Sequence, residues 1–198
     1  EREECCIFGW VNDGLLLIGS RTLDQFGANF GSPALLGLDG STGLLDEALL
    51  TSLPAISADG SMIAWGGPAG PRIHTLGATT ESLDLSTYAD AAGIDPALLR
   101  APAFAPDGNR IAWYGPSAAD ANTLALHITD RANQTIRTYD AIGASSIGGL
   151  NAATWNPGGE WLVFESYRGG EARPELIAWR PAADEVRQLG DGLRPLFS

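Results

Sequence analysis

The chain has 198 residues, of which 44% are hydrophobic and 18% are charged, so it is long enough for one substantial domain and is not composed like a disordered protein. Its formal net charge is −12, and all 12 basic residues are arginines that form no run along the chain. Such an acidic surface repels phosphate groups, which argues against nucleic acid and against membrane-surface partners, and no apolar stretch approaches the roughly 20 residues of a membrane span.

The two cysteines, Cys5 and Cys6, are adjacent near the start of the chain. Two neighbouring sulfurs cannot link distant segments, so a disulfide framework is excluded. Three states stay open: two free thiols, a strained vicinal disulfide, or a bond to another chain. No histidine lies close to them in sequence, so a thiolate metal site is not expected.

A motif recurs four times along the chain. Its copies are FGWVNDGLLLI (8–18), PAISADGSMIAW (54–65), PAFAPDGNRIAW (102–113) and ATWNPGGEWLVF (153–164). Aligned on Asp13, Asp59, Asp107 and Gly158, the copies are 46, 48 and 51 residues apart. This spacing is close to the ~40–50 residues of one four-stranded propeller blade.

Each copy predicts a β-hairpin. A short first strand with one large apolar residue precedes Asp-Gly or Gly-Gly, which favours a tight turn because glycine accepts a positive φ. Those apolar residues are Trp10, Ile56, Phe104 and Trp155. The second strands are almost continuously apolar, which predicts burial on both faces, as between stacked blades. They span 15–18, 62–65, 110–114 and 161–164.

The rest of each period predicts outer strands. They span 72–76 in the second copy, 123–129 and 135–139 in the third, and 175–179 and 185–189 in the fourth. Residues 86–100 are more than a turn needs, and Asp95-Pro96 ahead of Ala-Leu-Leu predicts a short helix inserted there. Residues 46–50 are interpreted in the same way.

The pattern Pro-x-aromatic-x-Pro-Asp-Gly-x-x-Ile-Ala-Trp resembles the WD-like repeat of TolB-type β-propellers. The same repeat occurs in the propellers of prolyl-oligopeptidase-like proteins and in many bacterial surface proteins. Residues 102–113 match it closely, whereas 54–65 carry Ala58 at the second proline and 153–164 carry Gly158 at the aspartate. The resemblance implies an all-β propeller of about four four-stranded blades, at approximately 7–52, 53–100, 101–150 and 151–192.

Residues 193–198 resemble the opening of another repeat, with Pro195 and Phe197 at the places of Pro102 and Phe104. Members of this family commonly close with six or seven blades, and an unclosed ring exposes strand edges. We therefore expect a segment of a larger propeller in one polypeptide, a ring completed by another chain, or a compact four-bladed ring closed by 195–198.

Catalytic chemistry is not predicted. The nearest approach to a nucleophile elbow is Ala144-Ser145-Ser146-Ile147-Gly148, in a small-residue linker. The two histidines, His74 and His127, both precede it, whereas α/β-hydrolases place the histidine last. We expect no catalytic residue and no enzyme activity in this chain.

Metal and cofactor sites are not predicted either. His74 and His127 are interpreted as ordinary strand residues, and 84–95 lacks the ligand spacing of a calcium loop. The equivalent Asp13, Asp59 and Asp107 share one end of the propeller. We interpret them as turn residues that bond their own backbone, rather than as a ring of cation ligands.

Six tryptophans raise the question of a ligand surface. Trp10, Trp65, Trp113 and Trp155 lie at repeat positions where large side chains fill the gap between blades, which predicts core packing. Trp161 and Trp179 break that pattern. With Tyr167 and Arg168 they are the candidate surface for a sugar or another small ligand.

The leading hypothesis is a non-catalytic binding or scaffolding module with a protein or peptide partner, located outside the cytoplasm in the periplasm or at the cell surface. Small inner-strand residues predict a roomy, mildly polar channel lined by Ala55, Ser57, Ala103, Ala105, Thr154 and Asn156. Insertions at 19–31, 86–100 and 141–151 are the expected interfaces. The alternatives are the substrate-gating propeller of a serine peptidase whose catalytic domain lies elsewhere, and an extracytoplasmic sensor of a sugar or small ligand.

Overall fold

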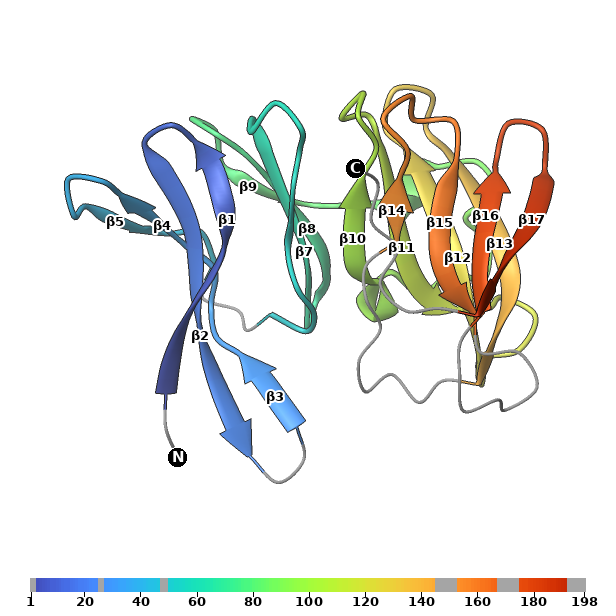
Figure 1. Ribbon diagram of the computed structural model, residues 1–198, viewed down its shortest axis with the longest axis horizontal. Coiled ribbons are helices and arrows are strands. Elements are labelled where there is room, and N and C mark those ends of the chain that lie inside the picture. Colours follow the sequence, from blue (N-terminus) through green and yellow to red (C-terminus); the bar gives the residue numbers. More distant parts are fainter. Residues whose placement is uncertain (1–2, 25–26, 47–49, 145–152, 167–174, 192–198) are drawn as a thin grey trace.

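A computed structural model of the protein describes residues 3–24, 27–46, 50–144, 153–166 and 175–191 (Figure 1). In these ranges the strands form four antiparallel sheets that follow one another in chain order, and the helices are two single turns of 3-10 helix. The all-β fold with about four blades is confirmed. Within the same ranges, no helix has the length and hydrophobicity that crossing a membrane requires.

In the second, third and fourth sheets each strand pairs with the next one along the chain, and the first sheet departs from this order at its third strand. The first contains β1 (Glu3–Asn12), β2 (Leu15–Asp24), β3 (Gly27–Phe30), β4 (Ala34–Gly37) and β5 (Thr42–Leu44). The second contains β6 (Ala55–Ile56), β7 (Met62–Gly67), β8 (Gly70–Thr75) and β9 (Thr80–Ser82). The third contains β10 (Arg100–Phe104), β11 (Arg110–Pro116), β12 (Thr123–Asp130) and β13 (Thr135–Ala144). The fourth contains β14 (Thr154–Trp155), β15 (Leu162–Ser166), β16 (Glu175–Arg180) and β17 (Glu185–Asp191).

Four strands were not placed from the sequence: β3, β4 and β5 in the first sheet and β9 in the second. The short β9 has only three residues, and two of them are exposed, so it carries no alternation of apolar and polar side chains. The expected insertion at 19–31 instead lengthens β2 and adds β3, which pairs with β2 alone and extends the first sheet beyond its neighbours (Figure 1).

The short helix predicted within 86–100 is confirmed as η2 (Pro96–Leu98), and a second turn, η1 (Leu85–Thr87), precedes it. Asp95 is the N-cap of η2, since its carboxylate accepts a hydrogen bond from the Ala97 amide at 2.9 Å. Leu99 follows the helix and is fully buried in the core between the second and third sheets. Part of the predicted helix at 46–50 lies outside the described residues.

The hairpin between the first two strands repeats the same hydrogen bonds from sheet to sheet. In the second sheet the Ser57 amide donates to the Met62 carbonyl, and the Gly60 amide donates to the Ser57 carbonyl, both across 2.9 Å. A four-residue loop results, closed by a β-turn that ends on a glycine at φ +69°. The third and fourth sheets repeat these bonds in the pairs Ala105–Arg110, Gly108–Ala105, Asn156–Trp161 and Gly159–Asn156.

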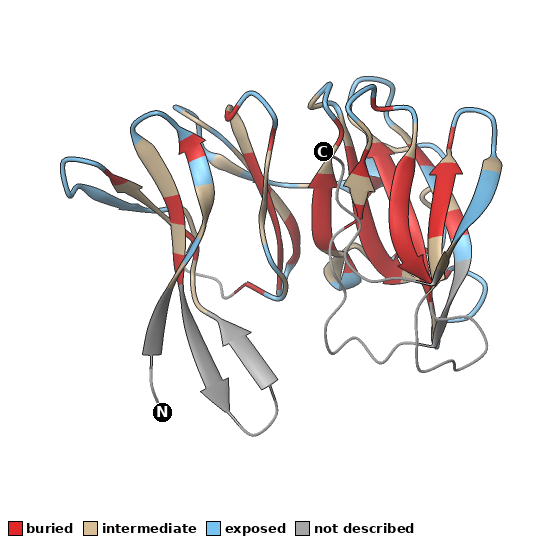
Figure 2. Ribbon diagram, viewed as in Figure 1, coloured by how far each residue is buried: buried red, intermediate tan, exposed pale blue. Residues whose placement is uncertain are grey.

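The core lies between consecutive sheets rather than inside any one of them. The side of a sheet that faces its predecessor carries an aromatic or aliphatic residue on the first strand and two more on the second. These sets are Ile56, Ile63 and Trp65; Phe104, Ile111 and Trp113; and Trp155, Leu162 and Phe164. Burial is most continuous in the third and fourth sheets, which are the deepest red in Figure 2.

The turn glycines pack against the preceding sheet. A Cβ on Gly60 would lie 1.8 Å from the Val11 carbonyl oxygen of the first sheet, and a Cβ on Gly108 would lie 3.1 Å from Cε of Met62 in the second. On Gly159 it would lie 3.0 Å from the Arg110 guanidinium of the third sheet. Glycine is therefore needed at Gly60 for the approach of two sheets as well as for its positive φ, whereas at Gly108 and Gly159 the methyl group would meet only side-chain atoms and no backbone.

Replacing Gly60 by alanine should separate these two needs when it is compared with Gly77→Ala. Gly77 also has a positive φ, at +79°, but nothing lies within 4 Å of the added methyl group. We expect Gly77→Ala to cost about 1 kcal/mol of unfolding free energy, the usual cost of left-handed backbone. Gly60→Ala should cost roughly 2 kcal/mol more, because the Val11 carbonyl must move.

Urea denaturation of the two variants and the parent protein measures both effects. Equal losses in the two variants would show that the second turn does not press on the first sheet.

Candidate functional site

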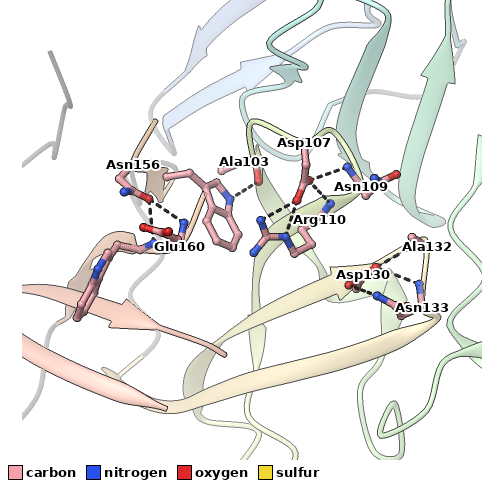
Figure 3. Close-up of polar contacts among 11 residues, drawn as sticks. Ala103, Asp107, Asn109, Arg110, Asp130, Ala132, Asn133, Asn156 and Glu160 are labelled. Atoms are coloured by element: carbon pink, nitrogen blue, oxygen red, sulfur yellow. Dashed lines mark hydrogen bonds and ion pairs between the residues drawn. The ribbon is translucent and has the colours of Figure 1, made fainter. Parts of the chain in front are cut away.

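The acidic turn residues stabilise the hairpins through their own backbone. Asp59 Oδ1 accepts hydrogen bonds from the Ser61 amide at 3.0 Å and from the Ser57 hydroxyl at 2.7 Å. Asp107 Oδ1 accepts from the Asn109 amide at 2.9 Å, and its other oxygen faces the Arg110 guanidinium (Figure 3). The described part of the chain contains no group of three or more His, Cys, Asp or Glu side chains that could hold a metal ion.

The fourth turn shows how the missing aspartate is replaced. Gly158 stands where Asp59 and Asp107 stand in the earlier copies. Asn156, two residues earlier, supplies the acceptor: its Oδ1 accepts from the amides of Glu160 and Trp161, both at 2.9 Å (Figure 3). The turn geometry is kept although the motif is degenerate.

The hydrogen bonds on Asp59 change its acidity. Donation from the Ser61 amide, then from the Ser57 and Ser61 hydroxyls, lowers its pKa from 3.8 to about 2. The carboxylate therefore stabilises the folded state fully above pH 4, and that contribution is lost as pH falls towards 2.

Asp59→Ala should therefore destabilise the protein at pH 7 by roughly 1 kcal/mol, a modest value because the carboxylate is exposed to solvent. The difference from the parent protein should shrink as the pH falls from 4 towards 2. The control is Asp13→Ala, since in that shorter turn Asn12 Oδ1 accepts from the Gly14 amide at 3.0 Å. Urea denaturation at several pH values measures both; a penalty at Asp59 that does not change with pH would contradict this account.

Both histidines form hydrogen bonds with residues on neighbouring strands. His127 on β12 is 0% exposed; Nε2 lies 3.1 Å from the Pro116 carbonyl and Nδ1 lies 3.0 Å from the Thr138 hydroxyl. A carbonyl can only accept, so Nε2 carries the proton and Nδ1 accepts from Thr138. Burial lowers the pKa of His127, which favours this neutral form. Both ring nitrogens are thus used inside the core.

His74 on β8 is half-buried, and burial lowers its pKa as well. Its Nδ1 lies 3.2 Å from the Thr80 hydroxyl, which itself donates to the Leu45 carbonyl at 3.0 Å. His74 and His127 lie on strands of different sheets. Ser145 and Ser146 lie outside the described residues.

The predicted channel residues divide into two groups. Ala55, Thr154 and Asn156 are half-buried, although the Asn156 side chain is committed to its turn. Ser57, Ala103 and Ala105 are buried. Ala103 and Ala105 are small because the fourth sheet packs on them, and the Trp155 indole nitrogen donates to the Ala103 carbonyl at 3.1 Å.

The tryptophans correct two further predictions. Trp65, Trp113 and Trp155 are buried between sheets, as predicted, but Trp10 is 57% exposed. Trp179 is only 2% exposed and packs beside Tyr139, so it belongs to the core and not to a ligand surface. The burial of Trp179 could not be predicted, because its position close to a turn does not show which face of the sheet the side chain occupies.

Trp161 is the predicted ligand residue that stays partly open. The guanidinium carbons of Arg180 and Arg187 lie 5.2 and 4.6 Å from its ring centre, and both arginines pair with Glu185. Two guanidinium groups therefore lie close to its ring, and the part of the side chain that stays open is flanked by cations. Tyr167 and Arg168 lie outside the described residues.

A pocket of about 320 Å³ lies between the third and fourth sheets. Its lining is Arg110, Ile128, Asp130, Thr135, Arg137, Trp155, Pro181 and Ala182. The charged groups are already engaged: Arg110 pairs with Asp107 at 2.6 Å and lies 5.0 Å from the Trp155 ring centre. The Asp130 carboxylate accepts from the amides of Ala132 and Asn133 (Figure 3). The pocket is therefore part of the packing interface between the third and fourth sheets.

The most unusual surface is one side of the first sheet. Ile7 pairs across the sheet with Ile18, Ile18 with Ala34, and Ala34 with Leu44. A second row joins Trp10, Leu16 and Leu36. Directly paired residues share a face, so all of them lie on one side of the sheet. We call these seven residues the apolar face: Ile7, Trp10, Leu16, Ile18, Ala34, Leu36 and Leu44.

The apolar face is open. Ile7, Trp10 and Leu44 are 67%, 57% and 59% exposed, and the other members are half-buried. Val11 and Leu17, on the opposite side, are buried against the second sheet. Figure 2 shows the same contrast between the first sheet and the red strands of the third and fourth. The prediction that residues 15–18 are buried on both faces is thus correct for one face only.

The register explains why this face is apolar. Trp10 pairs with Leu16 as Trp155 pairs with Leu162. Leu16 in turn pairs with Leu36, as Leu162 pairs with Trp179. The apolar face therefore corresponds to the side that the other three sheets bury against their predecessors.

Comparisons with known proteins place the fold. No protein-family model matches the chain, and no curated protein does. Among solved structures, the chain is similar to a protein assigned as TolB from Agrobacterium tumefaciens, with a TM-score of 0.61 and 16% identity over 96% of this chain and 63% of that one. It is also similar to TolB from Acinetobacter baumannii, with a TM-score of 0.59 and 13% identity over 96% and 44%.

A third similar structure is the β-propeller domain of the Trilobed protease from Pyrococcus furiosus, with a TM-score of 0.58 and 10% identity over 90% of this chain and 54% of that one. The chain thus has a TolB-like β-propeller fold, as the repeat implied. It spans less than two thirds of the length of each of these three structures.

Proposed function

We propose that the chain is a non-catalytic propeller module that binds a protein through the apolar face of its first sheet. The observation that carries the proposal is the exposure of Trp10 and Ile7 on β1 and of Leu44 on β5, all on the same side of the first sheet and joined by the half-buried apolar residues between them. Soluble proteins rarely leave such side chains together in water unless a partner covers them. A flat row of aliphatic side chains with one tryptophan suits a protein surface, because tryptophan is the residue most enriched among binding hot spots.

The electrostatics of the chain support a protein partner. Its net charge of −12 disfavours phosphate-bearing ligands, while the apolar face itself carries no charged residue. A propeller also suits this role, because packed sheets form a rigid frame for one fixed surface.

The non-catalytic part of the proposal is supported by the use of the polar side chains. Both ring nitrogens of His127 form hydrogen bonds, to the Pro116 carbonyl and the Thr138 hydroxyl, and the turn aspartates accept hydrogen bonds from nearby backbone amides. The extracytoplasmic location belongs to the same proposal and rests on the likeness of the repeat to those of bacterial surface proteins.

Trp10→Arg should abolish partner capture without loss of folding. Removing a hot-spot tryptophan typically costs at least 2 kcal/mol, so binding should weaken about 30-fold or more. The parent chain and the variant are used as bait in an extract of the source organism, and retained proteins are quantified by mass spectrometry. Because Trp10 is largely exposed, the unfolding free energy should change by no more than about 0.5 kcal/mol.

The matched control is Leu98→Arg, the same kind of change at a 41% exposed residue on η2. Proteins that bind the apolar face are retained by the parent chain and by Leu98→Arg but not by Trp10→Arg. Retention of the same proteins by all three chains would refute this function for the apolar face.

A further inference from the structure

The register of the third sheet places two rows of side chains at the pocket between the third and fourth sheets. Arg110 pairs with Asp130, and Asp130 pairs with Thr135, so these three residues form the first row. In the second row Ile128 pairs with Arg137. Directly paired residues share a face, as do residues two apart on a strand, so both rows face the fourth sheet.

The centre of the pocket is apolar and rigid. Ile128 and Trp155 are buried, and so is Pro181 on the fourth sheet. The Trp155 ring is fixed, because its indole nitrogen donates to the Ala103 carbonyl at 3.1 Å and the Arg110 guanidinium carbon lies 5.0 Å from its centre. Such a surface can receive an aliphatic group without losing side-chain freedom.

The Asp130 carboxylate is held in place but keeps room for a ligand. Its Oδ1 accepts from the amides of Ala132 and Asn133, both at 3.0 Å, and its Oδ2 accepts from the Asn133 side-chain amide at 2.9 Å. A carboxylate has roughly four acceptor sites, so Oδ2 can accept one more hydrogen bond. Within the described ranges, no cation forms an ion pair with Asp130.

Arg137 is an exposed cation at the outer side of the pocket. Its Nη1 donates to the Pro181 carbonyl at 2.9 Å, which fixes the guanidinium and leaves its other N–H groups for a ligand. In the part of the chain that the structure describes, it forms no ion pair, whereas Arg110 is neutralised by Asp107 at 2.6 Å. The pocket therefore offers one anchored cation and one anchored anion beside an apolar centre.

The size and charge of the site narrow the class of ligand. Its volume of about 320 Å³ is at the lower end of the roughly 300–1,000 Å³ of small-molecule sites. The net charge of −12 repels a ligand that is only anionic. A zwitterion has no net charge, and it supplies a carboxylate for Arg137 together with an ammonium group for Asp130.

We propose that this pocket binds a free α-amino acid with an aliphatic side chain. The ligand carboxylate pairs with the Arg137 guanidinium, its ammonium group donates to Oδ2 of Asp130, and its side chain lies on Ile128 and Trp155. The site is separate from the apolar face and does not depend on the protein partner proposed for that face.

Isothermal titration calorimetry with L-leucine, L-isoleucine and L-valine tests the site. Arg137→Gln should weaken binding about 10-fold or more, because a charge-assisted hydrogen bond to the ligand carboxylate is lost. Asp130→Asn should weaken it to a similar extent through the ammonium group, while the asparagine oxygen still accepts the amides of its turn.

The matched control is Arg187→Gln, which should leave binding unchanged. Arg187 is also an exposed arginine on the outer strand of its sheet, and it pairs with Ala178 as Arg137 pairs with Ile128. Ala182→Phe is a second test, because it fills the pocket from an exposed turn position without removing a polar group, and it should abolish binding. Urea denaturation checks that each variant is folded.

Two analogues of L-leucine test the charges of the ligand. Leucinamide lacks the carboxylate and 4-methylpentanoate lacks the ammonium group, so each should bind the parent chain about 10-fold or more weakly than L-leucine. Equal binding of either analogue would overturn the assignment of a zwitterion. A parent chain that binds none of the three amino acids up to about 10 mM, or folded Arg137→Gln and Ala182→Phe chains that bind as the parent does, would overturn the site itself.

Discussion

The structure depends on one repeated contact, in which a sheet lays a set of large apolar side chains on the sheet before it. Trp65, Trp113 and Phe164 are all fully buried in this way. Removing a buried aromatic side chain of this size typically costs 3–5 kcal/mol, more than any single hydrogen bond in the turns. Because no sheet buries both sides alone, each depends on its neighbours in the chain.

The turns set the distance at which this contact is made. Gly60, Gly108 and Gly159 bring the hairpin backbone close to the previous sheet, and at Gly60 a side chain would collide with the Val11 carbonyl. The aspartates and Asn156 then hold the turn by accepting amide hydrogens within it. The aspartates at the turn end of the sheets therefore stabilise their own turns. The apolar packing determines how the sheets join.

The same contact explains the properties of the two end sheets. The first sheet has the side chains that its successors bury, but no described sheet precedes it, so Trp10 stays in water. The fourth sheet presents Trp161 among arginines where the earlier sheets hold a residue against the next turn. The repeat therefore leaves an apolar side exposed on the first sheet and a cationic edge exposed on the fourth.

The sequence by itself determined the fold class, the four hairpins and the inserted helical turn, because these depend on residues close together in the chain: Asp-Gly turns, apolar runs, and Asp95-Pro96. Even the fourth copy could be recognised, although the replacement of its aspartate by Asn156 could not. Likewise, β9 carried no pattern, because one half-buried residue followed by two exposed ones does not alternate.

Only the tertiary structure decided which side of each strand meets another sheet. Trp10 and Trp155 occupy the same place in the motif, yet one is exposed and the other buried, since burial depends on whether a sheet lies opposite. The small size of Ala103 fits a residue on which the fourth sheet packs, and the hydrogen bond from the Trp155 indole to its carbonyl is a contact that only the tertiary structure reveals. The repeat determines the shape of each sheet. Which side chains of a sheet are exposed depends on the neighbouring sheets, whose residues are distant in sequence.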